Sequence, residues 1–461
     1  MSRRVAVVGG GVAGLTTAYR LQESDADVNV VLLERSRSLG GKIRTTPFMG
    51  RPVDEGPDAF LARVPWAVSL CEELGIADRF VSPAVASARV LIGGKLKRLP
   101  EGLALGIPVR FWPLVTSGIV SPVAALRAGL DLVKPDDWAG GDESVGDLVR
   151  RRLGDQIAER LVDPLVGSIY AGDTDELDLH LVTPQFEMAA RRHRSLINGL
   201  RAQRKQAPPS DAPVFHSFPD GLGHLVDVLS GRLRAVDVRT GVEVGSVAPG
   251  PDATVTVDVG GAAEAFDAVI LATPAHVTTD LLADSSPDTA SELGSIRFSS
   301  VAMVTMGLRR DQVGHRLDGS GMLVPRGERL LTTAVSWASS KWPHWADEDH
   351  VVLRVSAGRA GDERALALDD DTLVGTLLGE VARLLDIRGE LLEWRVSRWP
   401  KSFAQYAPGH DKLVTRAEAA LRNDVPGAFL TGASCRGLGI PAVIRQGGEA
   451  ATAVIDHLRG S

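Results

Sequence analysis

The first residues of the chain have the types and spacing of a dinucleotide-binding site. A β-branched run at residues 5–8 leads into Gly9-Gly10-Gly11-Val12-Ala13-Gly14. In such a segment the first glycine permits a tight turn, the second lets the backbone approach a pyrophosphate, and the third lets a helix pack closely on a strand. Glu34 follows about 20 residues after Gly14, where a carboxylate accepts hydrogen bonds from ribose hydroxyls. These residues predict a bound dinucleotide and leave open whether it is NAD or FAD.

A second pair of glycines follows the acid. Gly40-Gly41 lies between Arg35 and the basic residues Lys42 and Arg44. A glycine pair lets the main chain pass close to a bulky ligand, and basic side chains neutralise pyrophosphate charge. The same residues also fit an ordinary basic surface turn, so this segment alone does not decide between a ligand site and a turn.

The elements that must position these residues lie at both ends of the chain. Residues 5–33 have the pattern of a βαβ unit. Near the carboxyl end, a buried strand reaches Gly432, and a closing helix is predicted over residues 447–458. Because nucleotide-binding segments stand at both ends, we expect the domains to be interleaved along the chain.

The predicted secondary structure differs along the middle of the chain. Residues 100–200 are mostly helical in pattern, which predicts an inserted helical subdomain. Further expectations are a hairpin over residues 88–99, an exposed loop over 203–213, and pairing of a strand at 254–259 with one at 265–271.

Composition narrows the class of protein. The 461 residues carry a net charge of −7 and no basic run, which argues against a nucleic-acid partner. Cys71 and Cys435 are the two cysteines, so we expect neither a metal cluster nor a disulfide framework. The chain enters a nucleotide-binding strand almost at once, so we expect no signal peptide and a cytoplasmic protein.

The most apolar stretch runs over residues 111–126. It contains Pro113, Gly118 and Pro122 and is shorter than the roughly 20 apolar residues that a membrane span needs. It fits a pair of short helices in a core or pocket wall, which we favour, or an apolar patch in peripheral contact with a membrane.

Several segments resemble a known family. The glycine pair after Glu34-Arg35 resembles the second signature of the FAD-dependent amine oxidase and phytoene desaturase superfamily, which favours FAD over NAD. Within that superfamily the chain resembles the porphyrinogen oxidases of haem biosynthesis. The segments that carry this resemblance are residues 161–173, which include Tyr170-Ala171-Gly172, and residues 217–222, 399–410 and 437–441.

The resemblance implies an α/β fold, with a Rossmann-like FAD-binding domain interleaved with a substrate-binding α+β domain and an inserted helical subdomain. We assign residues 1–88, 214–295 and 416–461 to the FAD-binding domain, 89–213 to the helical and substrate part, and 296–415 to the substrate-binding sheet.

The resemblance also implies a set of site residues. Gly9 to Gly14 hold the pyrophosphate, Glu34 the ribose, the Val244 backbone the adenine, and Trp399 the flavin ring. The full set of expected FAD contacts is Gly9, Gly10, Gly11, Val12, Ala13, Gly14, Glu34, Arg35, Gly41, Lys42, Gly56, Pro57, Asp58, Ala59, Val244, Trp399, Gly432, Ile440, Pro441 and Ala442.

Three further residues are expected at the substrate. Arg89 matches a family arginine that pairs with a substrate propionate, and Ser168 and Tyr170 belong to the segment beside the flavin. Ser168 stands where the family usually has glycine, which puts the local backbone geometry in question. We expect no catalytic side-chain nucleophile, because the flavin carries the chemistry.

The implied reaction is the six-electron oxidation of coproporphyrinogen III in three FAD cycles, each passing electrons to O2 and yielding hydrogen peroxide. Protoporphyrinogen IX is the alternative substrate, and the product could be handed over to a ferrochelatase. A flavin amine oxidase is a more distant alternative, to which Lys341-Trp342 would contribute a lysine.

Overall fold

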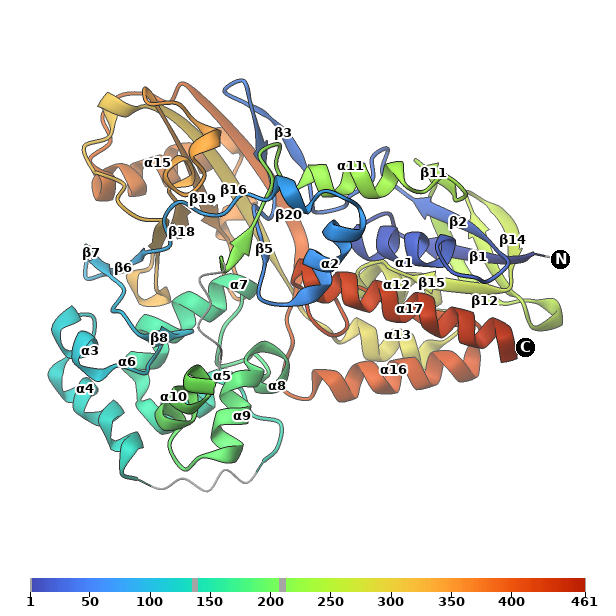
Figure 1. Ribbon diagram of the computed structural model, residues 1–461, viewed down its shortest axis with the longest axis horizontal. Helices are drawn as coiled ribbons and strands as arrows, with labels where there is room; N and C mark the ends of the chain where they lie inside the picture. The colour runs from blue at the N-terminus through green and yellow to red at the C-terminus, as the bar shows by residue number, and fades with distance from the viewer. Residues whose placement is uncertain (1, 135–139, 207–212, 461) are drawn as a thin grey trace.

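The computed structural model describes residues 2–134, 140–206 and 213–460. In Figure 1 a parallel sheet with its helices lies on the side of both chain ends, and a second sheet and a helical subdomain lie on the other side. The long strand β20 (Glu393–Ala404) and its neighbours connect the two halves.

The parallel sheet joins strands from distant parts of the chain. Its order is β11 (Asp237–Thr240), β2 (Val28–Glu34), β1 (Arg3–Val8), β15 (Ala268–Leu271) and β21 (Ala428–Leu430). Every neighbouring pair is parallel. Val5, Ala6 and Val7 in the central strand are fully buried, because helices and a small sheet cover both faces. The predicted contribution of both chain ends to one sheet is confirmed.

Two helices on one face of this sheet pack closely against each other. The long helix α17 (Ile440–Gly460) packs along α1 (Val12–Gln22). A Cβ at Gly447 would lie 2.8 Å from the Ala13 carbonyl oxygen, and Thr17 Oγ1 donates a hydrogen bond of 3.1 Å to the Gly447 carbonyl. The closing helix therefore begins earlier than predicted, at Ile440, and its glycine serves helix contact rather than a helix start.

The predicted strand pairing at residues 254–271 is partly wrong. A meander of β12 (Val244–Pro249), β13 (Val255–Val259) and β14 (Ala262–Phe266) is antiparallel, while β15 leaves it and joins β1. The change falls at Asp267, whose carboxylate accepts a hydrogen bond of 2.7 Å from the Arg4 N–H and pairs with Arg3 at 2.8 Å. Residue types alone do not reveal that the strand pattern before and after Asp267 belongs to two different sheets.

The second sheet has seven strands, in the order β20, β16 (Phe298–Arg309), β19 (His350–Ala357), β18 (Thr332–Ser336), β17 (Gly321–Leu323), β6 (Ala88–Ile92) and β7 (Lys95–Arg98). The predicted hairpin is confirmed as β6 and β7, which turn at Gly93 and Gly94 with φ of +57° and +73°. Helix α15 (Asp370–Leu385) shares a core with this sheet.

The predicted helical subdomain is confirmed. Its helices are α3 (Phe111–Ser117), α4 (Pro122–Gly129), α5 (Val145–Leu153), α6 (Asp155–Ile157), the π-helix η3 (Ala158–Gly167), α7 (Ser168–Tyr170), α8 (Leu179–Val182), α9 (Pro184–Arg192) and α10 (Leu196–Gln206). Helix α10 extends into the predicted loop over residues 203–213, and residues 207–212 of that loop lie outside the described residues. Within the described ranges, no helix has both the length and the apolar character to cross a membrane.

The apolar stretch at residues 111–126 forms two helices as predicted, but the preferred core position holds for only one side of them. Leu114 and Ala125 are buried, whereas Trp112, Val123 and Leu126 are 75%, 78% and 71% exposed. Short helices turn one apolar side toward the core and leave the other uncovered. The stretch is thus both a core wall and an exposed apolar patch.

Further strands and α-helices connect these units. They are β3 (Thr45–Phe48), β4 (Arg51–Asp54), β5 (Phe60–Leu61), α2 (Pro65–Glu73), β8 (Leu103–Ala104), β9 (Ile107–Pro108), β10 (Phe215–His216), α11 (Gly223–Gly231), α12 (Ala275–Leu282), α13 (Pro287–Gly294), α14 (Ala338–Lys341) and α16 (His410–Asp424).

Candidate functional site

The glycine-rich turn between β1 and α1 has the geometry of a phosphate cradle. Gly9 has φ of +109°, and a Cβ at Gly14 would overlap the Gly9 carbonyl oxygen. Gly11 is different, because a Cβ there would meet no atom of the described residues within 4 Å. Since Gly11 caps the N-terminus of α1, the open space beside it suits the diphosphate of a dinucleotide.

Glu34 lies at the carboxyl end of β2, next to this turn. Its carboxylate accepts hydrogen bonds of 2.6 Å from the Gly10 N–H and 2.7 Å from the Ser36 N–H. Its backbone carbonyl accepts one of 3.0 Å from the Val242 N–H, which places the start of β12, at Val244, beside it. An acid and a strand edge at this place fit the ribose and adenine of a dinucleotide. Arg35 is exposed next to Glu34.

The second glycine pair packs directly on the first. The Gly40 N–H donates a hydrogen bond of 2.8 Å to the Gly10 carbonyl, and a Cβ at Gly41 would lie 3.3 Å from Gly11 Cα. Gly41 has φ of +59°, which a glycine adopts without strain. The two glycine segments thus form one continuous backbone surface.

A third and a fourth segment extend this surface. Gly56 lies against the Lys42 carbonyl, and a Cβ on it would stand 3.5 Å from the Trp399 ring. The Trp399 indole N–H donates 3.3 Å to the Glu55 carbonyl, and Lys42 Nζ donates to the Ser402 carbonyl. Solvent reaches the Lys42 side chain, yet desolvation by the surrounding protein lowers its pKa to about 8. The structure therefore brings Lys42, Gly56 and Trp399 together, as the sequence-based map requires.

The carboxyl-terminal contribution comes from β21 and α17. Gly432, with φ of +109°, follows β21 and comes within 3.7 Å of the Ala13 side chain if a Cβ is added. Ile440, Pro441 and Ala442 form the first turn of α17. These residues meet the glycine-rich turn at the carboxyl edge of the parallel sheet, where open α/β sheets bind ligands.

Tyr406 positions the loop between β21 and α17, a role that no sequence pattern identified. Its fully buried hydroxyl donates 2.7 Å to the Ala433 carbonyl and accepts 3.0 Å from the Gly437 N–H. Burial raises its pKa well above the usual value, so the hydroxyl stays protonated. Its segment was singled out by resemblance, but nothing in the sequence distinguished this ring from a core aromatic.

The Asp58 side chain has three partners that are not among the predicted cofactor residues. Its carboxylate lies 3.0 Å from Lys341 Nζ, 3.1 Å from the Trp342 indole nitrogen and 3.3 Å from Arg354. Burial disfavours the ionised carboxylate, but Lys341 and Arg354 outweigh burial and lower the pKa of Asp58 to about 2. In the Gly56-Pro57-Asp58-Ala59 turn, Asp58 is thus an anchor of the backbone. Lys341, the lysine of the amine oxidase alternative, is engaged in this pair.

The residues predicted at the substrate lie in two places. Arg89 on β6 forms an ion pair of 2.6 Å with Asp318, which Arg98 also contacts. Ser168 is exposed, whereas Tyr170 is buried with its ring edge toward Tyr406 at a centroid distance of 5.9 Å. A carboxylate ligand at Arg89 would have to share or displace Asp318.

The segment before Gly172 has unusual backbone geometry. Pro164 lies inside the π-helix η3, and Ala171 has φ of +45°. π-Helical turns and left-handed non-glycine residues concentrate at functional sites. Arg326 holds the end of this segment by donating 2.6 Å to the Gly172 carbonyl.

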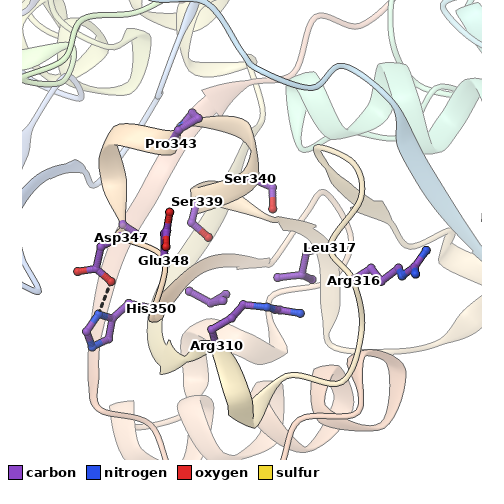
Figure 2. A pocket seen from close by; sticks show the side chains of 11 residues that line it. Arg310, Arg316, Leu317, Ser339, Ser340, Pro343, Asp347, Glu348 and His350 are labelled. Carbon is purple, nitrogen blue, oxygen red and sulfur yellow. Dashed lines mark hydrogen bonds and ion pairs between the residues drawn. The ribbon is translucent and has the colours of Figure 1, made fainter.

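A separate cavity of about 340 Å³ opens near the start of β19. Figure 2 shows Arg310, Ser339, Ser340 and His350 around it, with Asp347 hydrogen-bonded to His350. The described residues that line it include none of those predicted to bind cofactor or substrate. A second cavity of about 430 Å³ borders Gly41 and Arg44. In the part of the chain that is described, no three His, Cys, Asp or Glu side chains gather to hold a metal ion.

Because Gly11 and Gly14 have different surroundings, replacing each by alanine should affect a different property of the protein. Gly14→Ala should lower the free energy of unfolding by about 1–3 kcal/mol, because its methyl group overlaps the Gly9 carbonyl. Gly11→Ala should leave the stability of the FAD-free protein unchanged and weaken FAD binding about tenfold or more, because its methyl group enters the phosphate space. Denaturant unfolding of apoprotein and FAD titration test the pair. Equal FAD affinity of Gly11→Ala and wild type would contradict the assignment of this space.

Comparison with known proteins shows which family the chain resembles along its length. The family model described as flavin containing amine oxidoreductase matches residues 12–455. The chain is 33% identical to the coproporphyrinogen III oxidase of Bacillus subtilis, covering 99% of this chain and 98% of that protein. It is 35% identical to the coproporphyrinogen III oxidase of Mycobacterium leprae, covering 98% of both.

A solved structure has the same fold over the whole chain. It is an Exiguobacterium sp. 255-15 protein described as a protoporphyrinogen oxidase, with a TM-score of 0.89, 28% identity and 99% coverage of both chains. With a family match that covers nearly all residues, the chain belongs to the flavin containing amine oxidoreductase family, whose cofactor here is FAD.

Proposed function

We propose that the protein oxidises coproporphyrinogen III to coproporphyrin III with FAD and O2. The observation that carries this proposal is similarity along the entire chain to two proteins named coproporphyrinogen III oxidase. The site geometry supports it, because four segments form one extended backbone surface that begins at the phosphate cradle. The reaction balances as one porphyrinogen and three O2 giving one porphyrin and three hydrogen peroxide.

The cofactor-binding roles follow from the arrangement of the segments. We assign the pyrophosphate to Gly9–Gly14, with Arg35 and Lys42 supplying positive charge, and the ribose to the Glu34 carboxylate. Val244 serves the adenine through its backbone, and Gly41, Gly56, Pro57, Ala59 and Trp399 line the ring. Gly432 and the first turn of α17 approach the pyrimidine end, where a helix N-terminus stabilises negative charge.

Bound FAD supplies two-electron oxidation and passes the electrons to O2. The side chains of the protein orient the macrocycle, exclude water and compensate charge. Ser168 is exposed and Tyr170 is buried behind it, so we assign substrate contact to the exposed backbone and side chain of residues 168–169 and support of that segment to Tyr170.

Two alternatives differ in substrate. Protoporphyrinogen IX has two propionates and coproporphyrinogen III four, and the relatives' names favour the latter. An amine substrate is disfavoured, because Lys341 is held by Asp58 at 3.0 Å.

Turnover of the two porphyrinogens decides between these substrates. We expect aerobic coproporphyrin fluorescence with coproporphyrinogen III and a lower kcat/KM with protoporphyrinogen IX. Three hydrogen peroxide molecules should form per porphyrin. Purified protein that contains FAD but oxidises neither porphyrinogen would contradict the proposal, and a higher kcat/KM for protoporphyrinogen IX would replace it with the alternative.

Arg89 offers a test of propionate binding. Arg89→Ala should raise KM for coproporphyrinogen III roughly tenfold or more, because a charge-assisted hydrogen bond contributes about 1.5–3 kcal/mol. Its FAD content should not change. Arg98→Ala is the matched control, since Arg98 contacts the same Asp318 from a side chain that is 65% exposed. Equal KM values for Arg89→Ala, Arg98→Ala and wild type would remove Arg89 from the site.

We further propose that the exposed apolar patch of α3 and α4 contacts the surface of an anionic membrane. The patch comprises Trp112 and Val115 on α3, Val123 and Leu126 on α4, and Val133 shortly after α4, all exposed. Arg110 and Lys134 lie next to these residues in the chain, and Lys97 Nζ donates a hydrogen bond of 2.6 Å to the Gly118 carbonyl between the two helices. Basic residues beside an apolar patch are expected where a protein contacts a membrane surface that carries negative charge. Product hand-over to a ferrochelatase is the competing role for this surface.

Vesicle binding tests the patch. Vesicles with anionic lipid should co-sediment the wild type, and binding should fall several-fold when Trp112, Val123 and Leu126 are replaced by Ser. Coproporphyrinogen oxidation in solution should not change, and Val238→Ser, at an exposed valine of the parallel sheet, serves as control. Unchanged vesicle binding of the triple variant contradicts the membrane role. Loss of binding to purified ferrochelatase in the same variant would assign the surface to that partner.

A further inference from the structure

We propose that Arg354 is the positioning residue that holds the flavin-lining turn at Gly56-Pro57-Asp58. The inference rests on the proposed FAD site and concerns a residue that no sequence pattern identified. Arg354 lies on β19 in the seven-stranded sheet, while the turn follows β4 and lies against the Lys42 carbonyl. The contact therefore connects the seven-stranded sheet, through this turn, to the segment that packs on the glycine-rich turn.

One guanidinium holds both ends of this turn. Arg354 Nη2 donates to the Gly56 carbonyl, and Nη1 lies 3.3 Å from the Asp58 carboxylate. Pro57 between them has no N–H, so it cannot contribute a backbone donor to hold the turn. The Arg354 side chain is only 4% exposed, and its charge is compensated by Asp58.

The position of Gly56 is transmitted to the rest of the site. Gly56 lies between the Lys42 carbonyl and the Trp399 ring, without room for a side chain on the Lys42 side. Lys42 follows Gly41, which packs on Gly11. A shift of the Gly56 carbonyl would therefore displace groups along the surface that we assign to the flavin and the phosphates.

The surroundings of Arg354 fix its orientation. Its guanidinium stands 5.7 Å from the centroid of the Trp345 ring, and Lys341 and the Trp342 indole hold the other side of Asp58. Among the described residues, Arg354 Nε has no hydrogen-bond partner although it is buried. The hydrogen bond to Gly56 and the ion pair with Asp58 are therefore both made by its terminal nitrogens. A lysine, with a single compact ammonium group, cannot reproduce a planar two-point contact.

The test replaces Arg354 by lysine and measures FAD binding. We expect Arg354→Lys apoprotein to bind FAD about tenfold more weakly than wild type, because the Gly56 carbonyl loses the planar contact that fixes its position. The visible circular dichroism of the bound flavin should also change, since Gly56 and Trp399 border the ring. Neither readout depends on turnover.

Arg152→Lys is the matched control. Arg152 is a buried arginine that donates 2.7 Å to the buried Asp131 in the helical subdomain, away from the cofactor surface. Both variants should lose thermal stability, but only Arg354→Lys should change FAD affinity and the flavin spectrum. Wild-type affinity and spectrum in Arg354→Lys would overturn the inference.

A second variant keeps the test decisive if Arg354→Lys does not fold. Asp58→Asn leaves the Gly56 carbonyl contact possible but removes the ionic partner of Arg354, so FAD affinity should fall several-fold. Unchanged affinity would overturn the inference. Wild-type protein that binds FAD but oxidises no porphyrinogen would overturn the proposed substrate and leave the role of Arg354 intact, whereas wild type unable to bind FAD would overturn both.

Discussion

Close backbone contact between segments far apart in the chain is the constraint on which this structure depends. Gly41 packs on Gly11, Gly56 lies against the Lys42 carbonyl, and Gly447 lies against Ala13. In each case a side chain would fill the space that the neighbouring backbone or the cofactor needs. The extended surface exists because peptide groups, rather than side chains, form much of it. This explains why so few of its residues are chemically reactive.

Buried charged side chains also help to hold distant segments together. Asp58, Lys341 and Arg354 form a cluster, and the attraction within it overcomes the burial that opposes ionisation of Asp58. A cluster of this kind contributes little net stability, because desolvation costs nearly as much as the attraction returns. The cluster instead fixes the orientation of its three side chains, since each charge is compensated in one position only. Tyr406 has a similar role for the loop before α17, with neutral hydrogen bonds.

The helical subdomain buries some of its apolar side chains and exposes others. Its inner side joins a large core that includes Leu114 and Tyr170, while the outer side of α3 and α4 leaves apolar side chains in solvent. Exposed apolar area on this scale is unfavourable for an isolated protein and is typical of surfaces that are covered in use. The same subdomain carries the left-handed Ala171 near the predicted substrate segment, so the surface and the site belong to one unit.

The sequence by itself determined the dinucleotide fingerprint, the interleaving of the nucleotide-binding segments, the helical insertion and the β6–β7 hairpin. These features depend on local spacing, which a single sequence shows directly: glycines at fixed intervals, an acid after a strand and a turn between two strands. Resemblance added the identity of the cofactor and the prediction that Gly56 and Trp399 line it. Only the tertiary structure decided that the chain changes sheets at Asp267, that Asp58 turns toward Arg354, that Arg89 pairs with Asp318, and that Trp112 is exposed. The first three of these are set by a partner far away in the sequence, and the exposure of Trp112 by which side of a short helix the core covers. Neither periodicity nor residue type reveals which distant partner a buried charge or an apolar side chain will meet.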